Sequence, residues 1–356
     1  MKALHIHAGP GARQHLAQHG LQPQDIRLVP AAAGGPKGLI LKQLDQQIFG
    51  HWLPQGGHAV HLVGGSMGAW RMATAAMADP VRGFEDLTHG YIHQHVEPEP
   101  GRKRPTTGRI TQFFADQMAG FFDGHIDSIL AHPRWRLHVL TSRGRQVLRR
   151  ATPARTVVGF AGLTLGNLVS RQAVGLFLER TVFSSPGEAL PLPLNDLPTR
   201  HVGLSSANFL DAVRASCTIP FLLDGVHDIA GAPRGAHWDG GLVDYHLHWP
   251  YARLDNGLAL YPHFQRQVVP GWLDKALRWR HRPSPALSRL IVLAPNPAWV
   301  ARLPQGRLPN RDDFAGLTLP DRIRLWTRAV DEAQALADDW QSWLARGCPI
   351  HEVQGL

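Results

Sequence analysis

The sequence predicts an α/β fold with a mainly parallel central sheet and helices packed on it. Two strand–loop–helix units near the N-terminus support this prediction. Apolar runs at 26–30 and 60–63 are typical of strands, and the patterns at 37–49 and 67–78 that follow them are typical of helices. Such alternation favours parallel strands with helices on the sheet. With 44% hydrophobic and 18% charged side chains, the 356 residues have the composition of a folded globular chain.

The same patterns predict the later elements in chain order. They are a helix at 111–122, a strand at 136–141, an extended loop rich in Pro and Leu at 188–198, a helix at 208–216 and a strand at 290–293. The apolar stretch 157–178 is predicted to be a mostly buried helix followed by a second element. A membrane span is not expected there, because Asn167 and Arg171 interrupt the stretch.

The clearest helix is predicted at 320–346. Apolar residues recur there every three or four positions, and Gly347 and Pro349 follow the pattern and end it. We expect a single domain over residues 1–356, with its core at 25–90 and 205–295. The less regular region 95–200 is the candidate insertion or lid.

Charge and cysteine content limit the classes of partner. The formal net charge is +9, yet no helix-turn-helix, finger or RNA-binding signature accompanies it, so specific nucleic-acid recognition is not expected. Two cysteines and an N-terminus without an apolar run favour a cytoplasmic protein. The basic excess is compatible with peripheral contact with an anionic membrane, and it is equally compatible with compositional drift.

The segment 270–282 mixes indoles with basic side chains. Indoles prefer the headgroup level of a bilayer, and Arg and Lys favour anionic lipid. Two interpretations of Trp272 and Trp279 stay open: they contact a membrane, or they pack against the core.

The sequence GGSMG at 64–68 lies between the predicted strand at 60–63 and the helix that follows. It fits the pattern G-x-S-x-G, in which a sharp turn exposes a serine hydroxyl and small neighbours let the backbone pass close by. We therefore expect Ser66 to be a nucleophile, and Gly64 and Gly68 to shape its turn. The N-terminus of the following helix favours negative charge that develops there.

The sequence GGPKG at 34–38 follows the first predicted strand. Consecutive glycines leave backbone N–H groups uncovered, and such groups can stabilise an oxyanion. Gly34, Gly35, Lys37 and Gly38 are therefore candidates for an oxyanion hole. A phosphate cradle or a plain helix-entry loop would fit the same residues, although the P-loop spacing is absent.

The sequence DGG at 239–241 follows a turn-rich stretch. An Asp before two glycines is often simply a turn residue. However, a nucleophilic serine needs a base, and a carboxylate on a loop at the sheet edge can supply one. Asp239 is the candidate for that role.

Together these segments resemble the patatin-like phospholipase family. That family carries D-G-G-G-x-[KR]-G, G-x-S-x-G and D-G-[GA] in this order, and the segment AVRASCTIP at 212–220 is similar to its A-S-x-A-x-P motif. The resemblance covers roughly residues 25–90 and 205–245. Ala32 and Ala33 stand in place of the leading Asp and first Gly of the family's oxyanion motif, and Thr218 stands where Ala is usual.

The resemblance implies a three-layer α/β/α fold and a serine acyl hydrolase, related to phospholipases A and lysophospholipases, that acts on lipid or acyl-ester substrates. It implies a Ser66–Asp239 dyad without a catalytic histidine. Ser66 would attack the ester carbonyl, and Asp239 would take its proton and later activate water. Backbone N–H groups near Gly35–Gly38 would hold the oxyanion, with Lys37 in a structural or electrostatic role. Neither a metal nor another cofactor is expected.

Four alternatives stay open. An ordinary α/β-hydrolase would use a Ser–Asp–His triad, with its histidine among His246, His248, His263, His281 and His351. A malonyl-transferase-like enzyme would have a histidine where Gly65 stands. A metal enzyme could use the histidine pairs 89 and 93 or 246 and 248. A scaffold that keeps the fold without the activity is the fourth.

Overall fold

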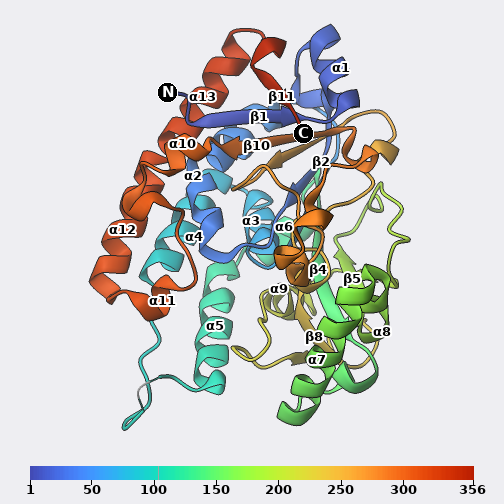
Figure 1. Ribbon diagram of the computed structural model, residues 1–356, viewed down its shortest axis with the longest axis vertical. Helices are drawn as coiled ribbons and strands as arrows, with labels where there is room; N and C mark the ends of the chain where they lie inside the picture. Colours follow the sequence, from blue (N-terminus) through green and yellow to red (C-terminus); the bar gives the residue numbers. More distant parts are fainter. Residues whose placement is uncertain (103) are drawn as a thin grey trace.

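The computed structural model describes residues 1–102 and 104–356, and position 103, within the predicted insertion, lies outside the described residues (Figure 1). The strands are β1 (Leu4–Ala8), β2 (Ile26–Ala31), β3 (Val60–Gly65), β4 (Trp135–Gly144), β5 (Leu178–Ser184), β6 (Thr199–Gly203), β7 (Val226–His227), β8 (Ala236–Asp239), β9 (Leu258–Pro262), β10 (Leu290–Pro295) and β11 (Val353–Gly355). The helices are α1 (Pro10–His19), α2 (Lys42–Asp45), α3 (Met67–Ala75), α4 (Pro80–His93), α5 (Thr107–Phe122), α6 (Ile126–Leu130), α7 (Pro153–Val169), α8 (Val174–Phe177), α9 (Phe209–Ser216), α10 (Pro297–Val300), α11 (Asp313–Gly316), α12 (Leu319–Glu332) and α13 (Gln334–Ala345).

Within the described residues the strands form one 11-stranded sheet. Its order is β11-β1-β10-β9-β2-β3-β4-β5-β6, and the β7–β8 hairpin pairs with β4 through β8. The central strands β10, β9, β2, β3 and β4 are parallel, whereas β1 and β5 run antiparallel to their inner neighbours. The predicted α/β class and mainly parallel sheet are confirmed, and the arrangement is consistent with three layers.

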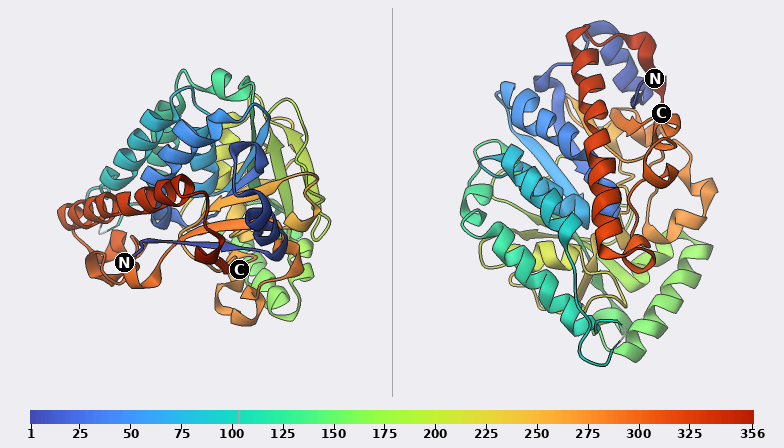
Figure 2. Two further views of the ribbon diagram at one scale, coloured as in Figure 1. Left: turned by 90° about the horizontal axis from the view of Figure 1, so that it is seen from above. Right: turned by 90° about the vertical axis from the view of Figure 1, so that its left-hand side faces the viewer.

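Helices stack outward from one side of the sheet. α3 packs on β2, β3 and β4, α4 packs on α3, and α12 packs on α4. Figure 2 shows α12 and α13 running along this side of the molecule. α9 packs on β4 and β8, and α5 packs on α9, so helices from distant parts of the chain surround the ends of the central strands.

Two predicted helices are correct in place but not in form. The helix predicted at 37–49 is a 3-10 segment (η2, Gly35–Leu41), then α2, then a π-helical segment (η3, Gln46–Trp52). The helix predicted at 320–346 is two helices, α12 and α13. They meet at Ala333, whose N–H bonds three residues back to Val330 at 3.1 Å and so tightens the turn.

The region 95–200 is not one insertion, because β4, β5 and β6 lie in the main sheet. Central position in a sheet depends on pairing with distant strands, which the weak local pattern of this region does not reveal. The stretches before β4, between β4 and β5, and between β5 and β6 stand outside the sheet. The predicted burial of 157–178 is also wrong, since α7 exposes much of its apolar surface.

The interpretation that buries both indoles of 270–282 is wrong as well. The Trp272 side chain is 41% exposed and the Trp279 side chain 62% exposed. No helix among the described residues is long and apolar enough to cross a membrane.

Glycine allows α3 to sit directly against the sheet. A Cβ atom on Gly68 would lie 2.1 Å from the carbonyl oxygen of Ala31 in β2, and a Cβ atom on Gly64 would lie 2.3 Å from the Gly68 carbonyl. Real Cβ atoms do not approach so closely, so both positions require glycine for space. This close contact fixes the start of α3, and with it Ser66, relative to β2 and β3.

We expect Gly68→Ala to lower the free energy of unfolding by about 1–3 kcal/mol, because the added methyl group must push α3 away from Ala31. The matched control is Gly90→Ala in α4, where the nearest neighbouring atom would lie 3.7 Å from the new Cβ. That change should raise the free energy of unfolding by up to about 1 kcal/mol. Urea unfolding followed by circular dichroism measures both. Equal effects of the two substitutions would contradict the packing argument.

Candidate active site

Ser66 occupies the turn between β3 and α3. Its backbone has φ 56° and ψ −134°, in a region that non-glycine residues rarely adopt. The side chain is only 6% exposed, yet it borders a cavity. The sharp turn predicted from GGSMG is therefore present, with Gly64 and Gly68 at its closest packing points.

Ser66 and Asp239, 173 positions apart, form a direct hydrogen bond. The Ser66 hydroxyl donates to Asp239 Oδ2 at 2.7 Å, and the backbone N–H of Gly241 donates to Asp239 Oδ1 at 2.7 Å. The Asp239 backbone is held on both sides: its N–H donates to the Thr218 carbonyl at 2.8 Å, and its carbonyl accepts from the Ser142 hydroxyl at 2.8 Å. The carboxylate thus presents one oxygen to Ser66 while the other is occupied.

Ser216 is a further site residue whose role the sequence analysis did not assign. Its hydroxyl accepts from the backbone N–H of Ser66 at 2.9 Å and donates to the Leu140 carbonyl in β4 at 2.6 Å. It therefore ties the serine turn to the sheet. The available signal was its place in the segment AVRASCTIP, but the segment alone says nothing about what Ser216 contacts.

Burial makes Asp239 a stronger base than an ordinary aspartate. Loss of solvent raises the pKa of its carboxyl from 3.8 to about 6, against the opposing effects of the hydrogen bonds from Ser66 and Gly241 and of the Arg311 charge. Burial raises the pKa of the nearby Cys217 thiol well above its ordinary value, which keeps that thiol protonated and weakly nucleophilic at neutral pH.

The four oxyanion candidates lie in and beside the start of η2. Gly35 has φ 55° and borders the same cavity as Ser66. Gly34 lies against the Phe264 ring, where a Cβ atom would come within 2.3 Å. The Lys37 ammonium lies 5.6 Å from the centre of the Phe264 ring, and Gly38 packs near Met67 at the start of α3.

Ala32 and Ala33, which directly precede the oxyanion candidates, are both buried. The Ala33 N–H donates to the Tyr245 carbonyl at 2.9 Å, so it is already occupied. The backbone N–H groups from Gly35 onward are the remaining candidates for an oxyanion, while the Lys37 charge stays at the aromatic ring.

Three of the histidines that a triad could use, His246, His263 and His281, have other hydrogen-bond partners. His246 Nδ1 contacts the Gln267 carbonyl and the Val269 N–H, both at 3.1 Å, and His263 Nδ1 accepts from the Gln265 N–H at 2.9 Å. Across residues 1–102 and 104–356, no histidine side chain is hydrogen-bonded to Ser66 or Asp239. The geometry thus favours the two-residue arrangement over a triad.

The cavity beside Ser66 has a volume of about 640 Å³. Its walls are mostly apolar and come from α3, α5, the 217–223 segment and α11. The apolar lining includes Trp70, Ile110, Phe113, Phe114, Leu222 and Leu223. Arg104 and Arg311 also border it, so an apolar chain and a polar or anionic group can both be accommodated.

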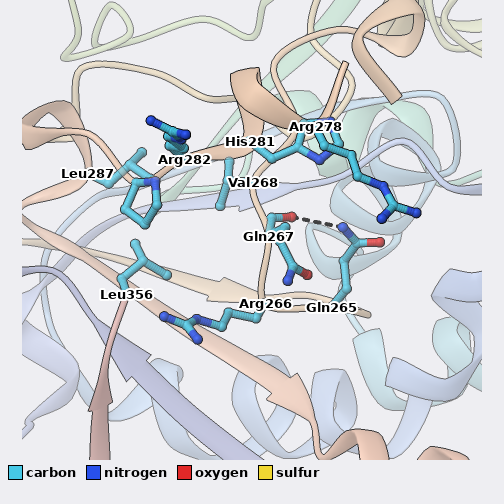
Figure 3. A pocket seen from close by; sticks show the side chains of 10 residues that line it. Gln265, Arg266, Gln267, Val268, Arg278, His281, Arg282, Leu287 and Leu356 are labelled. Carbon is cyan, nitrogen blue, oxygen red and sulfur yellow. Dashed lines mark hydrogen bonds between the residues drawn. The ribbon is translucent and has the colours of Figure 1, made fainter. Parts of the chain in front are cut away.

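A second cavity, of about 500 Å³, is lined by a different part of the chain. Figure 3 shows Arg266, Arg278 and Arg282 around it with their guanidinium groups pointing in different directions, and Gln265 donating to the Gln267 carbonyl at 3.0 Å. It holds no serine or cysteine and shares no lining residue with the Ser66 cavity. The chemistry described above therefore belongs to the Ser66 cavity alone.

In the part of the chain that the structure describes, no group of three or more His, Cys, Asp or Glu side chains is placed to hold a metal ion. The imidazole rings of His89 and His93 stack with their centres 4.1 Å apart, but they lie on the exposed face of α4.

The chain has few detectable similarities to known proteins. No protein-family model matches the chain, and no curated protein matches it. One solved structure that it resembles is that of VipD from Legionella pneumophila, with 13% identity over 95% of this chain and 70% of that chain and a TM-score of 0.34.

The raised pKa of Asp239 predicts a pH-dependent effect of Asp239→Asn on stability. Because the carboxyl pKa is about 6 in the folded chain and near 3.8 when unfolded, its ionised form opposes folding above pH 6. Asn removes this cost, so the variant should exceed the wild type in free energy of unfolding by up to about 3 kcal/mol at pH 8. The gain should vanish as the pH falls toward 3.8. Denaturant unfolding at several pH values measures it, and a difference independent of pH would contradict the argument.

Proposed function

We propose that this chain is a serine acyl hydrolase that cleaves carboxylic ester bonds of lipids in the manner of patatin-like phospholipases. The observation that carries the proposal is the 2.7 Å hydrogen bond from the Ser66 hydroxyl to Asp239 Oδ2. A nucleophile and its base within hydrogen-bond reach, with the base oriented by a third group, is the arrangement that covalent catalysis requires. Here the third group is the Gly241 N–H.

Acylation follows from this arrangement. As Ser66 Oγ attacks the carbonyl carbon, its proton passes to Asp239 Oδ2, and negative charge develops on the carbonyl oxygen. Backbone N–H groups in the Gly35–Gly38 segment and the N-terminus of α3 would stabilise that charge. When the tetrahedral intermediate collapses, the ester C–O bond breaks, and the departing alkoxide takes the proton from Asp239.

Deacylation uses the same groups in reverse. Asp239, again ionised, accepts a proton from a water molecule that attacks the acyl carbon of the acyl-enzyme. Ser66 then leaves as the alcohol by recovering that proton, and the carboxylic acid product is released. A pKa of about 6 suits both steps at neutral pH, because Asp239 is ionised there and is more basic than a solvated aspartate.

The cavity supports an amphiphilic substrate. Its apolar walls favour an acyl chain, and the guanidinium groups of Arg104 and Arg311 at its border favour a polar or anionic head group. A lysophospholipid or phospholipid has both parts.

Substitution of Ser66 tests the proposal directly. Ser66→Ala should lower kcat/KM for p-nitrophenyl esters by at least about a thousandfold, because the acyl-enzyme can no longer form. The same variant should not be labelled by a fluorophosphonate probe. Ser342→Ala, at an exposed position of α13, is the matched control and should retain activity and labelling.

Asp239→Asn separates the dyad from a triad. It should lose activity about as fully as Ser66→Ala, while His246→Ala and His263→Ala, if folded, should lose much less. The wild-type rate should fall below a pH of about 6 as Asp239 is protonated. If the folded wild type neither hydrolyses esters nor is labelled by the fluorophosphonate, the proposal is overturned. A scaffold without activity would then be the remaining interpretation.

The cavity predicts selectivity for acyl-chain length. Ile110 of α5 borders the cavity, so Ile110→Trp should fill part of it and lower kcat/KM for long-chain esters about tenfold, with little change for acetate or butyrate esters. Gln112→Trp places the same indole on the exposed side of α5 and is the control. Equal loss across all chain lengths in Ile110→Trp would show that the acyl chain binds elsewhere.

A further inference from the structure

We propose that one exposed face of α7 is the surface by which this protein docks on an anionic lipid bilayer. This docking face is defined by Val157, Val158, Leu165, Leu168 and Val169 of α7 and Leu176 of α8. The inference deepens the proposed function, on which it rests, because a lipid ester hydrolase must reach substrate that is packed in a membrane.

The outward side of α7 is mostly apolar, and the hydroxyl of its exposed Thr164 is hydrogen-bonded within the helix to the Phe160 carbonyl at 2.8 Å. Val158 is 64% exposed, Leu165 65% and Val169 87%. The inward side is apolar too, since Phe160 and Leu163 are buried in the cluster that also contains Trp238. A helix with apolar residues on both sides is expected in a fully buried position, yet α7 is at the surface. The exposed side of α7 therefore has a binding partner that is not part of this chain.

The charges around the docking face indicate the kind of partner. From Arg143 to Leu178 the sequence has six arginines and no Asp or Glu. Arg143 pairs with Glu179, Arg171 pairs with Asp274, and Arg145 donates to the Gly175 carbonyl.

The other three arginines, Arg149, Arg150 and Arg155, are exposed at or just before the start of α7. Among the described residues they have no ion-pair partner. Apolar side chains with cations beside them match the acyl region and the phosphates of an anionic membrane surface.

The inward side of α7, opposite the docking face, leads toward the Ser66 cavity. The Phe160 ring on α7 lies 5.6 Å from the ring of Phe221, which is 62% exposed. Leu222, the next residue, is 38% exposed and lines the cavity. Figure 1 shows α7 and the cavity-lining α5 at the same end of the molecule. A bilayer on α7 that also reached the exposed Phe221 and Leu222 would lie next to the Ser66 cavity.

The segment 270–282 extends this surface at the C-terminal end of α7. Asn167 of α7 donates to Asp274 at 2.9 Å, and Arg280 donates to the Asn167 carbonyl at 2.8 Å. The exposed indoles of Trp272 and Trp279 flank these contacts along the chain, and indoles favour the headgroup level of a membrane. A second copy of the chain is the alternative occupant of the docking face, and the experiments below distinguish it from a bilayer.

Vesicle binding by the full chain tests the proposal. Ser66→Ala serves as the background, so that no lipid is hydrolysed. It should co-sediment with equimolar phosphatidylcholine–phosphatidylglycerol vesicles. Its binding to vesicles of pure phosphatidylcholine should be at least about tenfold weaker. Adding Val158→Glu and Leu165→Glu should weaken binding to the anionic vesicles at least about tenfold. The control, Gln18→Glu with Gln341→Glu, adds the same charge at exposed positions of α1 and α13 and should bind normally.

The arginines are tested in parallel. Arg149→Gln, Arg150→Gln and Arg155→Gln together should lose at least about tenfold in binding, whereas Arg82→Gln, Arg324→Gln and Arg328→Gln, on α4 and α12, should not. No binding to anionic vesicles, or unchanged binding in Val158→Glu/Leu165→Glu, would overturn the proposal. So would a dimer, seen by light scattering, that the glutamate pair dissociates.

Hydrolysis of a soluble short-chain ester, measured with Ser66 intact, separates this inference from the proposed function. If the glutamate pair abolishes vesicle binding but retains soluble turnover, the docking face is supported. If the parent chain binds vesicles but has no soluble turnover, the docking face stands and the hydrolase proposal fails.

Discussion

Everything at the site depends on the close approach of two glycine-containing turns. The β3–α3 turn meets the loop after β8, where a Cβ atom on Gly65 would lie 3.3 Å from the Gly240 carbonyl carbon and one on Gly240 would lie 2.3 Å from the Leu140 carbonyl oxygen. Side chains at these positions would hold the two loops apart. Because glycine removes that barrier, Ser66 and Asp239, 173 positions apart in the sequence, reach hydrogen-bond distance. Ser216 then ties the same turn to β4.

The cost of this arrangement appears in Asp239 itself. A carboxylate buried beneath a turn loses its hydration, and the two hydrogen bonds that it accepts only partly replace it, so its pKa stays raised. What opposes folding at neutral pH is also what makes the group basic enough to accept a serine proton. Loss of stability in exchange for reactivity is typical of functional sites. The positive φ of Ser66 is a second example, because this strained backbone angle also lowers stability.

The outer parts of the chain are consistent with a substrate that is apolar at one end and charged at the other. The Ser66 cavity is apolar along its walls and has arginines at its border, and the proposed docking face of α7 repeats that combination on a larger scale. Phe221 and Leu222 connect the two, because they belong to the segment that follows the buried Ser216. The stretch 216–222 therefore contacts the nucleophile turn through Ser216 and lines the cavity through Leu222.

The sequence alone determined the parts that depend on local pattern. The apolar runs of β2 and β3, the positions of the helical segments after them, the serine turn and the Asp-Gly-Gly loop were predictable, because strand and helix periodicity and turn chemistry act over a few residues. Tertiary structure decided the rest. β4 joins the centre of the sheet through pairing with distant β3 and β5, and Ser216 acquires its role only where the turns cross. The sequence pattern of an apolar stretch such as 157–178 does not distinguish a buried helix from an exposed one, since exposure depends on which neighbours the fold provides.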